Sequence, residues 1–487
     1  MKTERLNIRP ACAADAAFTF ALSNDALVRR NSAHSQAIAW NEHVAWFARM
    51  LASPDCLFYI VESAGEPIGQ VRFNRRERGW ECSGSLVEAW RGKGLSARFL
   101  RAALVRSGLP EVVGMSKVSN RVAIAPLLAN GYRLVGRETL DGEDYEVYRY
   151  RDRVLTIAEL SANHRGDLGR AKELVAAAAE AGADAVKLQT YTADTMTLDC
   201  DRGAFRISGG TLWDGMTLHE LYRRAATPWE WTAELKAEAE KRGIELFSTP
   251  FDRTAADFLE RAGVPRYKIA SFEASDLPLV RHVAAKGRPM LISVGTSTPE
   301  EMQETVEACF DAGNFDVTLL KCTSAYPARP EAMHLATIRD MVERFGSQGV
   351  RIGLSDHSLS GEVPVAAVAL GARTIEKHLT LDRPEGDAEA SFSLLPGEFA
   401  AMVGATRAAL AATGDRSYAV DPVARRGRRS LFVAEDVKAG ELLTERNVRS
   451  VRPGDGCEPK YLPELLGRRA VRDLKKGTPM SRGFAQT

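Results

Sequence analysis

Two short segments of the chain end in residues that can bind metals or move protons. The segment GLSDHSLS, residues 353–360, places Ser355, Asp356 and His357 directly after a short apolar run. Further along, TIEKHLT repeats this design with Glu376 and His378. Imidazole and carboxylate groups are common ligands of divalent cations and common general acids and bases. Two strands that end in histidine indicate a site, although two histidines alone also fit hydrogen-bonded loop residues.

An alternation of short apolar strands and alanine-rich helices has to position these residues. It begins at Val154 and continues to about Thr413. Eight strand–helix units in succession favour a closed (β/α)8 TIM barrel over an open sheet, and functional groups of such barrels lie at the C-terminal ends of the strands. The pattern predicts strands at 154–159, 184–188, 244–247, 266–270, 288–294, 316–321, 350–354 and 373–377, with helices such as 170–181, 230–242, 253–262, 299–312 and 361–370 between them.

Polar residues follow every predicted strand of this barrel. His357 and His378 leave neighbouring strands, so we expect them to share a divalent cation, and the oxygen ligands nearby favour Mn²⁺ or Mg²⁺ acting as a Lewis acid. Lysines and hydroxyls at the other strand ends predict a small anion that carries phosphate and carboxylate groups. The strand-end residues are Glu159, Asn163, His164, Lys187, Gln189, Ser248, Thr249, Lys268, Ser271, Glu273, Ser293, Thr323, Ser324, Ser355, Asp356, His357, Glu376 and His378.

The composition sets limits on the class of protein. The chain has 487 residues, 45% of them hydrophobic and 26% charged, with a formal net charge of +1. This charge favours neither nucleic acid nor an anionic membrane, and no apolar run reaches the length of a membrane helix. Seven cysteines without a CxxC pair are typical of reduced thiols, so we expect a cytoplasmic protein.

Changes in composition and in hydrophobic pattern along the sequence predict an α/β chain of three domains. We expect an α+β domain at residues 1–150, the barrel at 151–413, a basic linker at 414–429 and a small domain at 430–487.

Several segments of the barrel resemble the sialic acid synthase family. They are IAELSANHRGDLGRA, AGADAVKLQTYT, LFSTPFD, YKIASFEASDLPLV, GLSDHS and IEKHLTLD, and DVKAGELLTERNVRSVRPGDG near the end resembles the antifreeze-like (SAF) domain of that family. The resemblance implies condensation of phosphoenolpyruvate with an N-acetylated amino sugar to a nine-carbon ulosonic acid and phosphate. TLHELYRRAATPWEW, residues 217–231, resembles the pseudaminic acid branch, which uses a 2,4-diacetamido-2,4,6-trideoxy hexose. An N-acetylneuraminic or legionaminic acid synthase, and a degenerate barrel that serves as a dimerisation scaffold, are the alternatives.

The resemblance also assigns roles by position. It makes His357 and His378 the metal ligands and Glu159 the acid beside the reacting carbons. Asp356 and Glu376 are further catalytic candidates because they stand next to the histidines at the strand ends. Arg452 matches an arginine that reaches the sugar pocket of the partner subunit, which implies a homodimer. The resemblance places Lys187, Gln189, Thr249, Lys268, Ser271, Ser293 and Ser355 at phosphoenolpyruvate-binding positions. The strand-end positions add Asn163, His164, Ser248, Glu273 and Thr323 as substrate-binding candidates.

Two segments of the chain depart from that family's pattern. SVGTST stands where STGM is usual, at the exit of the fifth strand. YEVYRYRDRVLTIAE runs straight into the first barrel strand, without the hairpin that closes the barrel floor, so the first domain is a candidate for that role.

The first 150 residues resemble GNAT-superfamily acetyltransferases. Their VEAWRGKGLSARFLRAAL follows a predicted strand and opens a helix, and its glycines let backbone N–H groups approach a pyrophosphate. The resemblance implies acetyl-CoA as the cofactor and acetylation of a nucleotide-linked 4-amino sugar. The tyrosine that is often the general acid in the superfamily would fall near Leu127, which cannot donate a proton, leaving Glu62, Glu81 or water. The implied cofactor-binding residues are Arg91, Gly92, Lys93, Gly94, Leu95, Ser96 and Asn120.

Overall fold

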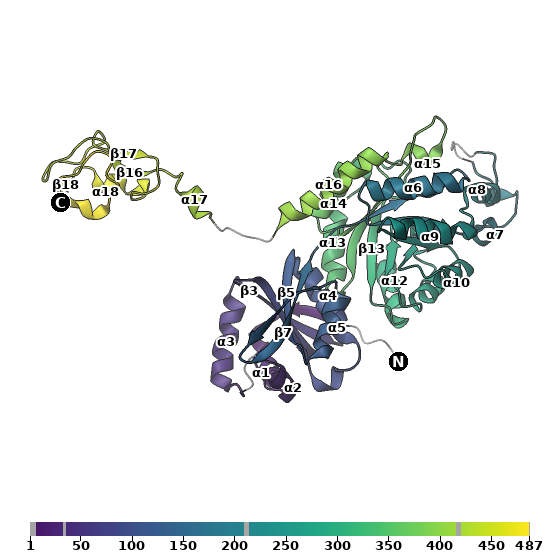
Figure 1. Cartoon of the computed structure of the whole chain (residues 1–487), viewed down its shortest axis with the longest axis horizontal. Helices are drawn as coiled ribbons and strands as arrows, with labels where there is room; N and C mark the ends of the chain where they lie inside the picture. Colours follow the sequence, from purple (N-terminus) through teal and green to yellow (C-terminus); the bar gives the residue numbers. More distant parts are fainter. Residues whose placement is uncertain (1–5, 33–35, 209–213, 415–419, 487) are drawn as a thin grey trace. The chain divides into compact units, whose positions relative to one another are not determined.

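The computed structural model describes residues 6–32, 36–208, 214–414 and 420–486. The chain divides into two compact units, Met1–Asp415 and Arg416–Thr487 (Figure 1). The first unit contains a mixed sheet and a closed barrel, and the second is a small β-rich domain. No helix among the described residues is both long and apolar enough to span a bilayer.

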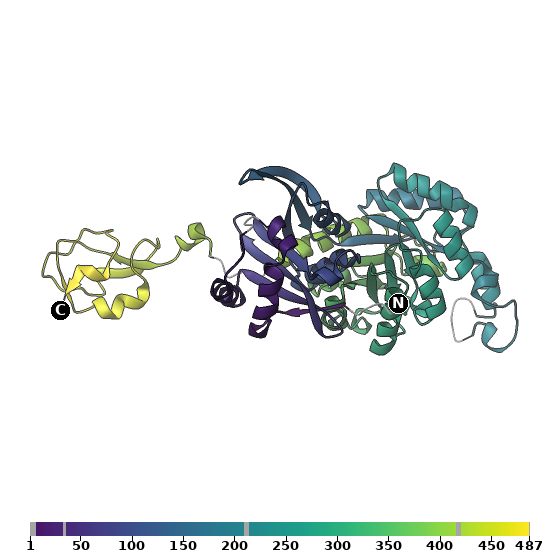
Figure 2. The same cartoon turned by 90° about the horizontal axis from the view of Figure 1, so that it is seen from below.

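The first domain is one seven-stranded sheet with helices, in the order β1-β2-β3-β4-β5-β7-β6. Only β4 and β5 pair in parallel within it, through Glu81 with Val113 and Cys82 with Gly114, and beyond these pairs the two strands separate. The outer strand β6 is largely exposed, while β7 pairs with β5 along its length (Figure 2). The elements are β1 Leu6–Pro10, α1 Ala16–Ser23, α2 Ala26–Asn31, α3 Trp40–Ala52, β2 Cys56–Ser63, β3 Glu66–Arg76, β4 Gly79–Leu86, α4 Leu95–Ser107, β5 Glu111–Lys117, α5 Arg121–Ala129, β6 Arg133–Leu140 and β7 Glu143–Arg151.

The middle of the chain closes into a barrel of eight parallel strands, in the order β10-β11-β12-β13-β14-β15-β8-β9, as the sequence predicts. Its strands are β8 Leu155–Glu159, β9 Ala185–Thr190, β10 Glu245–Pro250, β11 Tyr267–Ile269, β12 Met290–Ser293, β13 Val317–Cys322, β14 Arg351–Asp356 and β15 Thr374–His378. Its helices are α6 Leu168–Glu180, α7 Ala193–Met196, α8 Leu218–Ala225, α9 Thr232–Lys241, α10 Arg253–Arg261, α11 Leu277–Ala284, α12 Pro299–Asp311, α13 Ala336–Phe345, α14 Glu362–Ala369, α15 Ala388–Ser391 and α16 Pro396–Thr413.

Local sequence signals explain where the barrel helices begin. Asp167, Asp252 and Asp276 each accept hydrogen bonds from backbone N–H groups of the first turn of α6, α10 and α11. Thr298 and Glu301 form a capping box at the start of α12. Such caps satisfy N–H groups that have no partner within the helix, so each helix starts directly after a strand-end loop. The loops that carry the strand-end residues are thereby held at both ends.

The first domain packs against the bottom of the barrel, where the strands begin. Helix α4 lies beside α13 and the 3-10 turn Gly346–Gln348 (Figure 1). The guanidinium of Arg101 is 2.7 Å from the carboxylate of Asp316, and that of Arg98 lies over the rings of Phe310 and Phe315. The two domains keep separate apolar cores, and Arg98 and Arg101 bridge them at this contact.

The second unit is held by a small core of its own. Strands β16 Ser430–Val433 and β17 Val448–Val451 pair antiparallel, as do β18 Arg469–Ala470 and β19 Ala485–Gln486. Two short helices, α17 Pro422–Arg425 and α18 Leu462–Leu465, complete it. The buried residues are Leu431, Val433, Val437, Leu443, Val448, Leu465, Ala470, Leu474 and Met480.

Candidate active sites

Two lysines and two glutamates meet inside the barrel, in what we call the charge cluster (Glu159, Lys187, Lys268 and Glu376). Glu159 lies 2.5 Å from the Nζ of Lys187. The carboxylate of Glu376 lies 3.7 Å from the Nζ of Lys187 and 3.1 Å from that of Lys268. All four side chains are 5% exposed or less. Because little water reaches them, their charges interact at a low effective dielectric.

The charge cluster controls the ionisation of its own members. Burial alone would raise the pKa of Glu376, but Lys187 and Lys268 outweigh it and hold this pKa below its ordinary value. Burial alone would lower the pKa of Lys187, but Glu159 and Glu376 raise it. For Lys268, burial prevails and lowers the pKa despite the attraction of Glu376. Lys268 shares its counter-ion with a second lysine, so an incoming anion would meet a cation that is incompletely neutralised.

Hydroxyl groups extend the cluster toward its neighbours. Thr249 accepts a hydrogen bond from Lys187 at 3.1 Å, and Ser355 donates to Glu376 at 3.0 Å. Around them, several buried polar atoms have no hydrogen-bond partner in the described part of the chain: Ser293 Oγ, Ser324 Oγ, Glu273 Oε2 and Glu376 Oε2. Buried polar atoms are nearly always satisfied, so this group marks space for a polar ligand.

His357 and His378 lie next to each other, with ring centres 5.3 Å apart. Two imidazoles that bind one cation at about 2.1 Å and at roughly a right angle have ring centres about 5 Å apart, so the pair fits a shared ion. The Nδ1 of His357 is 3.1 Å from the carbonyl oxygen of Thr323 and donates to it in the tautomer that leaves Nε2 free. Burial and the neighbouring His378 lower the pKa of His357 to about 3, so it is neutral at pH 7, as a metal ligand must be.

Other groups around the two histidines were not apparent from the sequence. The ring of Tyr326 lies 4.4 Å from that of His357, and the ring of Phe392 lies 4.8 Å from that of His378. The carboxylate of Glu389 is 3.5 Å from Nδ1 of His378. These residues lie beyond the strand ends, Tyr326 in a loop and Glu389 and Phe392 in and directly after the short helix α15, where no pattern of spacing marks them. Among the described residues, no three His, Cys, Asp or Glu side chains could hold a metal by themselves. A cation on the two histidines would therefore need water or substrate oxygens.

Asp356 pairs with Lys377 and not with the charge cluster. Its carboxylate is 2.5 Å from the Nζ of Lys377, with both side chains fully buried, and it accepts from Ser358 N at 2.8 Å. Alternation along a strand explains this arrangement, since Ser355 and Glu376 face inward and the residues that follow them face outward. The Asp356–Lys377 pair ties β14 to β15 and positions His357, so Asp356 is a positioning residue in this structure.

Further predicted residues hold loops or orient Glu159. Gln189 donates to Glu159 Oε1 at 3.1 Å and thereby fixes that carboxylate. Asn163 donates to Leu379 O at 3.0 Å, and His164 Nε2 is 3.0 Å from Thr227 Oγ1. Ser248 pairs with Thr190 at 2.6 Å, and Gly295 N donates to Ser271 Oγ at 3.2 Å. The structure thus places Gln189 at the charge cluster and gives Asn163, His164, Ser248 and Ser271 partners in the surrounding shell.

The pH dependence of protein stability tests whether the side chain of Glu273 is buried. Its burial raises its pKa from 4.5 to about 7. A raised folded-state pKa means that the stabilising contribution is full below pH 4.5 and is lost as the pH rises through 7, by at most about 3 kcal/mol. We expect the apparent Tm of the wild-type protein to fall between pH 5 and pH 8, relative to a Glu273→Gln variant that cannot ionise. Parallel scanning calorimetry checks this difference, and equal pH profiles would contradict the burial of a protonated Glu273.

The turn between β4 and α4 is an open glycine turn directly before a helix. Gly92 and Gly94 adopt φ values of +71° and +73°, and a Cβ at either position would meet no atom within 4 Å. Leu95 and Ser96 begin α4, and Asn120 follows β5, so both lie where β4 and β5 have separated. Arg91 is 2.8 Å from Asp25, and Lys93 lies 4.6 Å from the ring of Trp90.

A tyrosine that the sequence analysis did not single out lies where β4 and β5 separate, at what we call the sheet gap of the first domain. Tyr132 is 2% exposed, and its hydroxyl lies 3.6 Å from Sγ of Cys82, the last residue of β4 that pairs with β5. Burial and Cys82 raise its pKa well above 10, so it stays protonated. Glu62 is 2.6 Å from Arg9 and Glu81 is 3.4 Å from Arg76. Tyr132 is therefore a further candidate for the acid that Leu127 cannot be.

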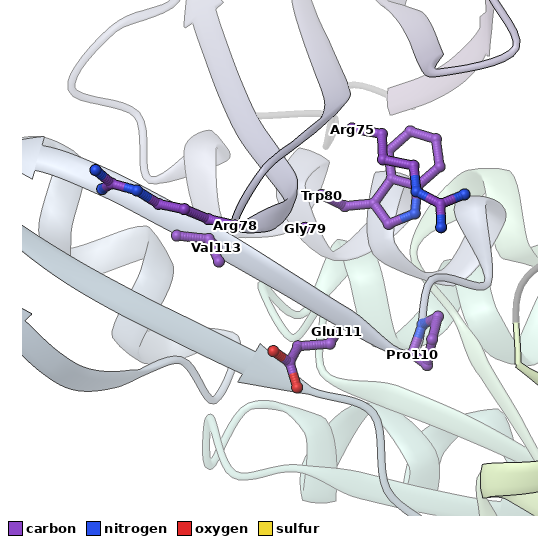
Figure 3. Close-up of a pocket in the computed structure, with 7 residues that line it drawn as sticks. All are labelled: Arg75, Arg78, Gly79, Trp80, Pro110, Glu111 and Val113. Atoms are coloured by element: carbon purple, nitrogen blue, oxygen red, sulfur yellow. The ribbon is translucent and has the colours of Figure 1, made fainter. Parts of the chain in front are cut away.

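A small recess opens on the first domain at the start of β4 and β5. It has a volume of about 150 Å³, and Figure 3 shows Arg75 and Trp80 on one side and Glu111 with Pro110 on the other. Its remaining lining residues are Arg78, Gly79 and Val113. Val113 pairs in register with Glu81, so the recess lies next to the point where the two strands part.

Arg452 follows β17 in the second unit and is exposed. Its exposure leaves the guanidinium available to a ligand.

Three family profiles match successive parts of the chain. They are the NeuB family at residues 174–418, the SAF domain at 428–481 and the acetyltransferase (GNAT) domain at 5–132. The pseudaminic acid synthase of Campylobacter jejuni is 46% identical over 337 residues, which is 69% of this chain and 97% of that protein. The pseudaminic acid synthase of Helicobacter pylori is 44% identical over 329 residues, or 67% of this chain and 96% of that protein.

A solved structure gives the same result for the fold. The N-acetylneuraminic acid synthetase of Leptospira borgpetersenii, in complex with citrate, matches with a TM-score of 0.50 at 28% identity and covers 60% of this chain and 94% of that one. The chain belongs to the NeuB family, and it carries an acetyltransferase domain before the barrel and a SAF domain after it. Its similarity to these synthases shows that the chain is an enzyme of this family. The alternative of a degenerate barrel that serves only as a scaffold is therefore rejected.

Proposed function

We propose that the barrel condenses phosphoenolpyruvate with a 2,4-diacetamido-2,4,6-trideoxy hexose to give pseudaminic acid and phosphate. The observation that supports this most is the charge cluster next to the histidine pair, in a chain 46% identical to a pseudaminic acid synthase. In the reaction, C3 of phosphoenolpyruvate forms a bond to the aldehyde carbon of the open-chain sugar. Water adds at C2, and the C–O bond to phosphate then breaks.

The barrel residues have distinct roles in this proposal. Lys187 and Lys268 bind the phosphate and carboxylate of phosphoenolpyruvate, in exchange for part of their contact with Glu376. Glu159, fixed by Gln189, lies beside the reacting carbons and transfers a proton there. A divalent cation, when held by His357 and His378, would supply Lewis-acid polarisation of the aldehyde. Manganese or magnesium suits such a site, with water or substrate oxygens as further ligands.

The choice of sugar separates the proposal from its alternative. An N-acetylneuraminic or legionaminic acid synthase would share the same charge cluster and histidine pair. A competition assay among N-acetylmannosamine and the stereoisomeric diacetamido trideoxy sugars, at equal concentration, tests it. We expect the precursor of pseudaminic acid to be consumed first, and preference for N-acetylmannosamine would overturn the assignment.

We further propose that residues 1–150, 151–413 and 430–487 act as an acetyltransferase, a synthase and a dimerising SAF module, joined by a linker at 414–429. The first domain would use acetyl-CoA to acetylate a nucleotide-linked 4-amino sugar. The open backbone at Gly92 and Gly94 supports this cofactor.

A Gly94→Glu variant tests the acetyl-CoA site. A side chain at φ +73° strains the turn, and its carboxylate would meet the pyrophosphate, so we expect acetyl-CoA binding to fall below detection. Phosphoenolpyruvate condensation should stay at the wild-type rate, because the barrel site lies at other strand ends. Calorimetry with acetyl-CoA and a condensation assay on the same sample measure both, with Gly65→Glu, another exposed turn glycine with φ +86°, as the matched control. Unchanged acetyl-CoA affinity would count against the site.

The SAF domain is proposed to complete the sugar site of the partner subunit through Arg452. Arg452→Ala and His378→Ala proteins should each be nearly inactive alone. Their heterodimer combines one intact barrel with one intact arginine, so one working site per dimer should reappear. Co-purification with two different tags isolates the heterodimer. Verified heterodimers without activity would contradict an arginine that acts in trans.

A further inference from the structure

A cavity of about 940 Å³ lies between the first domain and the floor of the barrel. One wall consists of the C-terminal end of α5, the start of β6 and the end of β7. The other consists of residues at or just before the starts of barrel strands β8, β11, β12, β13, β14 and β15. The first domain therefore covers the floor without filling it.

This cavity is lined by seven arginines and no lysine, and we call it the arginine chamber. Two aspartates, Asp152 and Asp316, are the acidic residues of its wall. Guanidinium groups bind phosphates in a planar, bidentate manner that an ammonium cannot reproduce. The seven arginines are Arg133, Arg149, Arg151, Arg153, Arg266, Arg351 and Arg373.

The carboxylates around the arginine chamber are too few to neutralise it. Glu111 serves both Arg149 and Arg151, and Asp316 serves Arg351 as well as Arg101, a residue outside the chamber wall.

Of the four remaining arginines, two have a carboxylate partner and two do not. Arg373 pairs with Asp152, and Arg266 pairs with Glu245. Arg133 and Arg153 form no ion pair within the part of the chain that the structure describes, and both are exposed. The chamber therefore keeps an excess of positive charge over its carboxylates, which attracts anions.

The rest of the wall suits an aromatic base. Tyr150 supplies an aromatic ring, and Val135, Leu155 and Leu291 add apolar surface. Cavities of roughly 300–1,000 Å³ are typical of sites for small-molecule ligands. Arg133 and Arg153 have no carboxylate partner among the described residues, and Arg149 and Arg151 share Glu111, so the remaining positive charge can engage more than one phosphate and the ligand carries two or more phosphates. We propose that the arginine chamber is a binding site for a nucleoside diphosphate or a molecule that contains one.

This site is separate from both candidate active sites. It lies at the starts of the barrel strands, whereas the charge cluster lies toward their ends. Arg151 pairs in register with Glu111 at the start of β5, the end opposite to that followed by Asn120. Because both walls contact the ligand, its binding should stabilise the packing of the first domain on the barrel. The inference does not depend on the proposed synthase or acetyltransferase reactions.

Calorimetry of the full chain with UDP at physiological salt tests the proposal. We expect the wild-type protein to bind UDP, and an Arg133→Glu/Arg153→Glu variant to bind it at least tenfold more weakly. The matched control, Arg30→Glu/Arg49→Glu, makes the same change of charge on exposed residues of the first domain outside the chamber and should bind as the wild type does. Inorganic pyrophosphate should bind more weakly than UDP, because it lacks a base. Hydrogen exchange should slow at residues 129–135 and 149–155 when UDP is added.

Three results would overturn the proposal. They are no heat from UDP or ADP at millimolar concentration, equal weakening in the matched control, and protection confined to residues 88–120. Pyrophosphate that binds as tightly as UDP would overturn the nucleotide part. CoA added to the Gly94→Glu protein identifies the source of the nucleotide: competition with UDP assigns the chamber to the nucleotide of the coenzyme, and its absence assigns it to another nucleotide, such as one linked to a sugar.

Discussion

A His357→Gln protein is expected to lose condensation activity by roughly 1,000-fold or more, because Lewis-acid stabilisation contributes several kcal/mol to the transition state. The same loss is expected for His378→Gln. EDTA should abolish wild-type activity, and Mn²⁺ or Mg²⁺ should restore it. Neither ion should rescue the variants. A coupled phosphate-release assay with and without chelator measures all of these.

Stability controls separate loss of the ligand from loss of the fold. Glutamine keeps most of the volume next to Tyr326 and Phe392, so the Tm should change little. His282→Gln is the matched control, since His282 lies on barrel helix α11 and pairs with Asp257 at 2.7 Å. Wild-type turnover by His357→Gln in the presence of chelator would show that the histidine pair holds no required cation.

Lys268→Met is expected to lower kcat/KM for phosphoenolpyruvate by roughly 100-fold or more, because it removes one cation aimed at the anion in a buried site. Glu376 keeps Lys187 at 3.7 Å and Ser355 at 3.0 Å, so the remaining carboxylate is not left alone in the core. The loss should lie mainly in KM for phosphoenolpyruvate, with KM for the sugar nearly unchanged. Steady-state kinetics with each substrate varied in turn measure the split.

Lys236→Met serves as the control for this lysine, because Lys236 lies on α9 and pairs with Glu240 on the outside of the barrel. Its kinetics should match those of the wild type. If Lys268→Met instead raised KM for the sugar and left KM for phosphoenolpyruvate unchanged, the anion would have to bind elsewhere.

The barrel could be predicted from the sequence because its strand–helix pattern is local and recurs along the chain. Each apolar strand followed by an amphipathic helix is a unit that the chain repeats eight times, and only a closed arrangement buries all of them. Strand ends could therefore be read in order, and Glu159, Lys187, Lys268 and Glu376 do meet in the structure. The alternation within a strand, which sends Ser355 inward and Asp356 to Lys377, requires an exact strand boundary that local pattern does not give.

Contacts between distant segments could not be predicted in this way. The approach of Tyr326 and Phe392 to the histidines depends on loops whose course no periodicity encodes. The arginine chamber draws on strands from two domains, and its arginines are scattered from 133 to 373, so their convergence appears only after folding. Tyr132 was visible in the sequence, but its place at the sheet gap follows from the register of β4 with β5.

Phosphate release from phosphoenolpyruvate with a panel of sugars tests the central claim most directly. The full-length protein is incubated with phosphoenolpyruvate, Mn²⁺ and one sugar at a time, and the ulosonic acid formed is identified by mass and by NMR. The account predicts phosphate and product in equal amounts with the diacetamido trideoxy hexose that corresponds to pseudaminic acid, and neither without sugar. Absence of phosphate release with every N-acetylated sugar of the panel, from a folded protein supplied with metal, would contradict it.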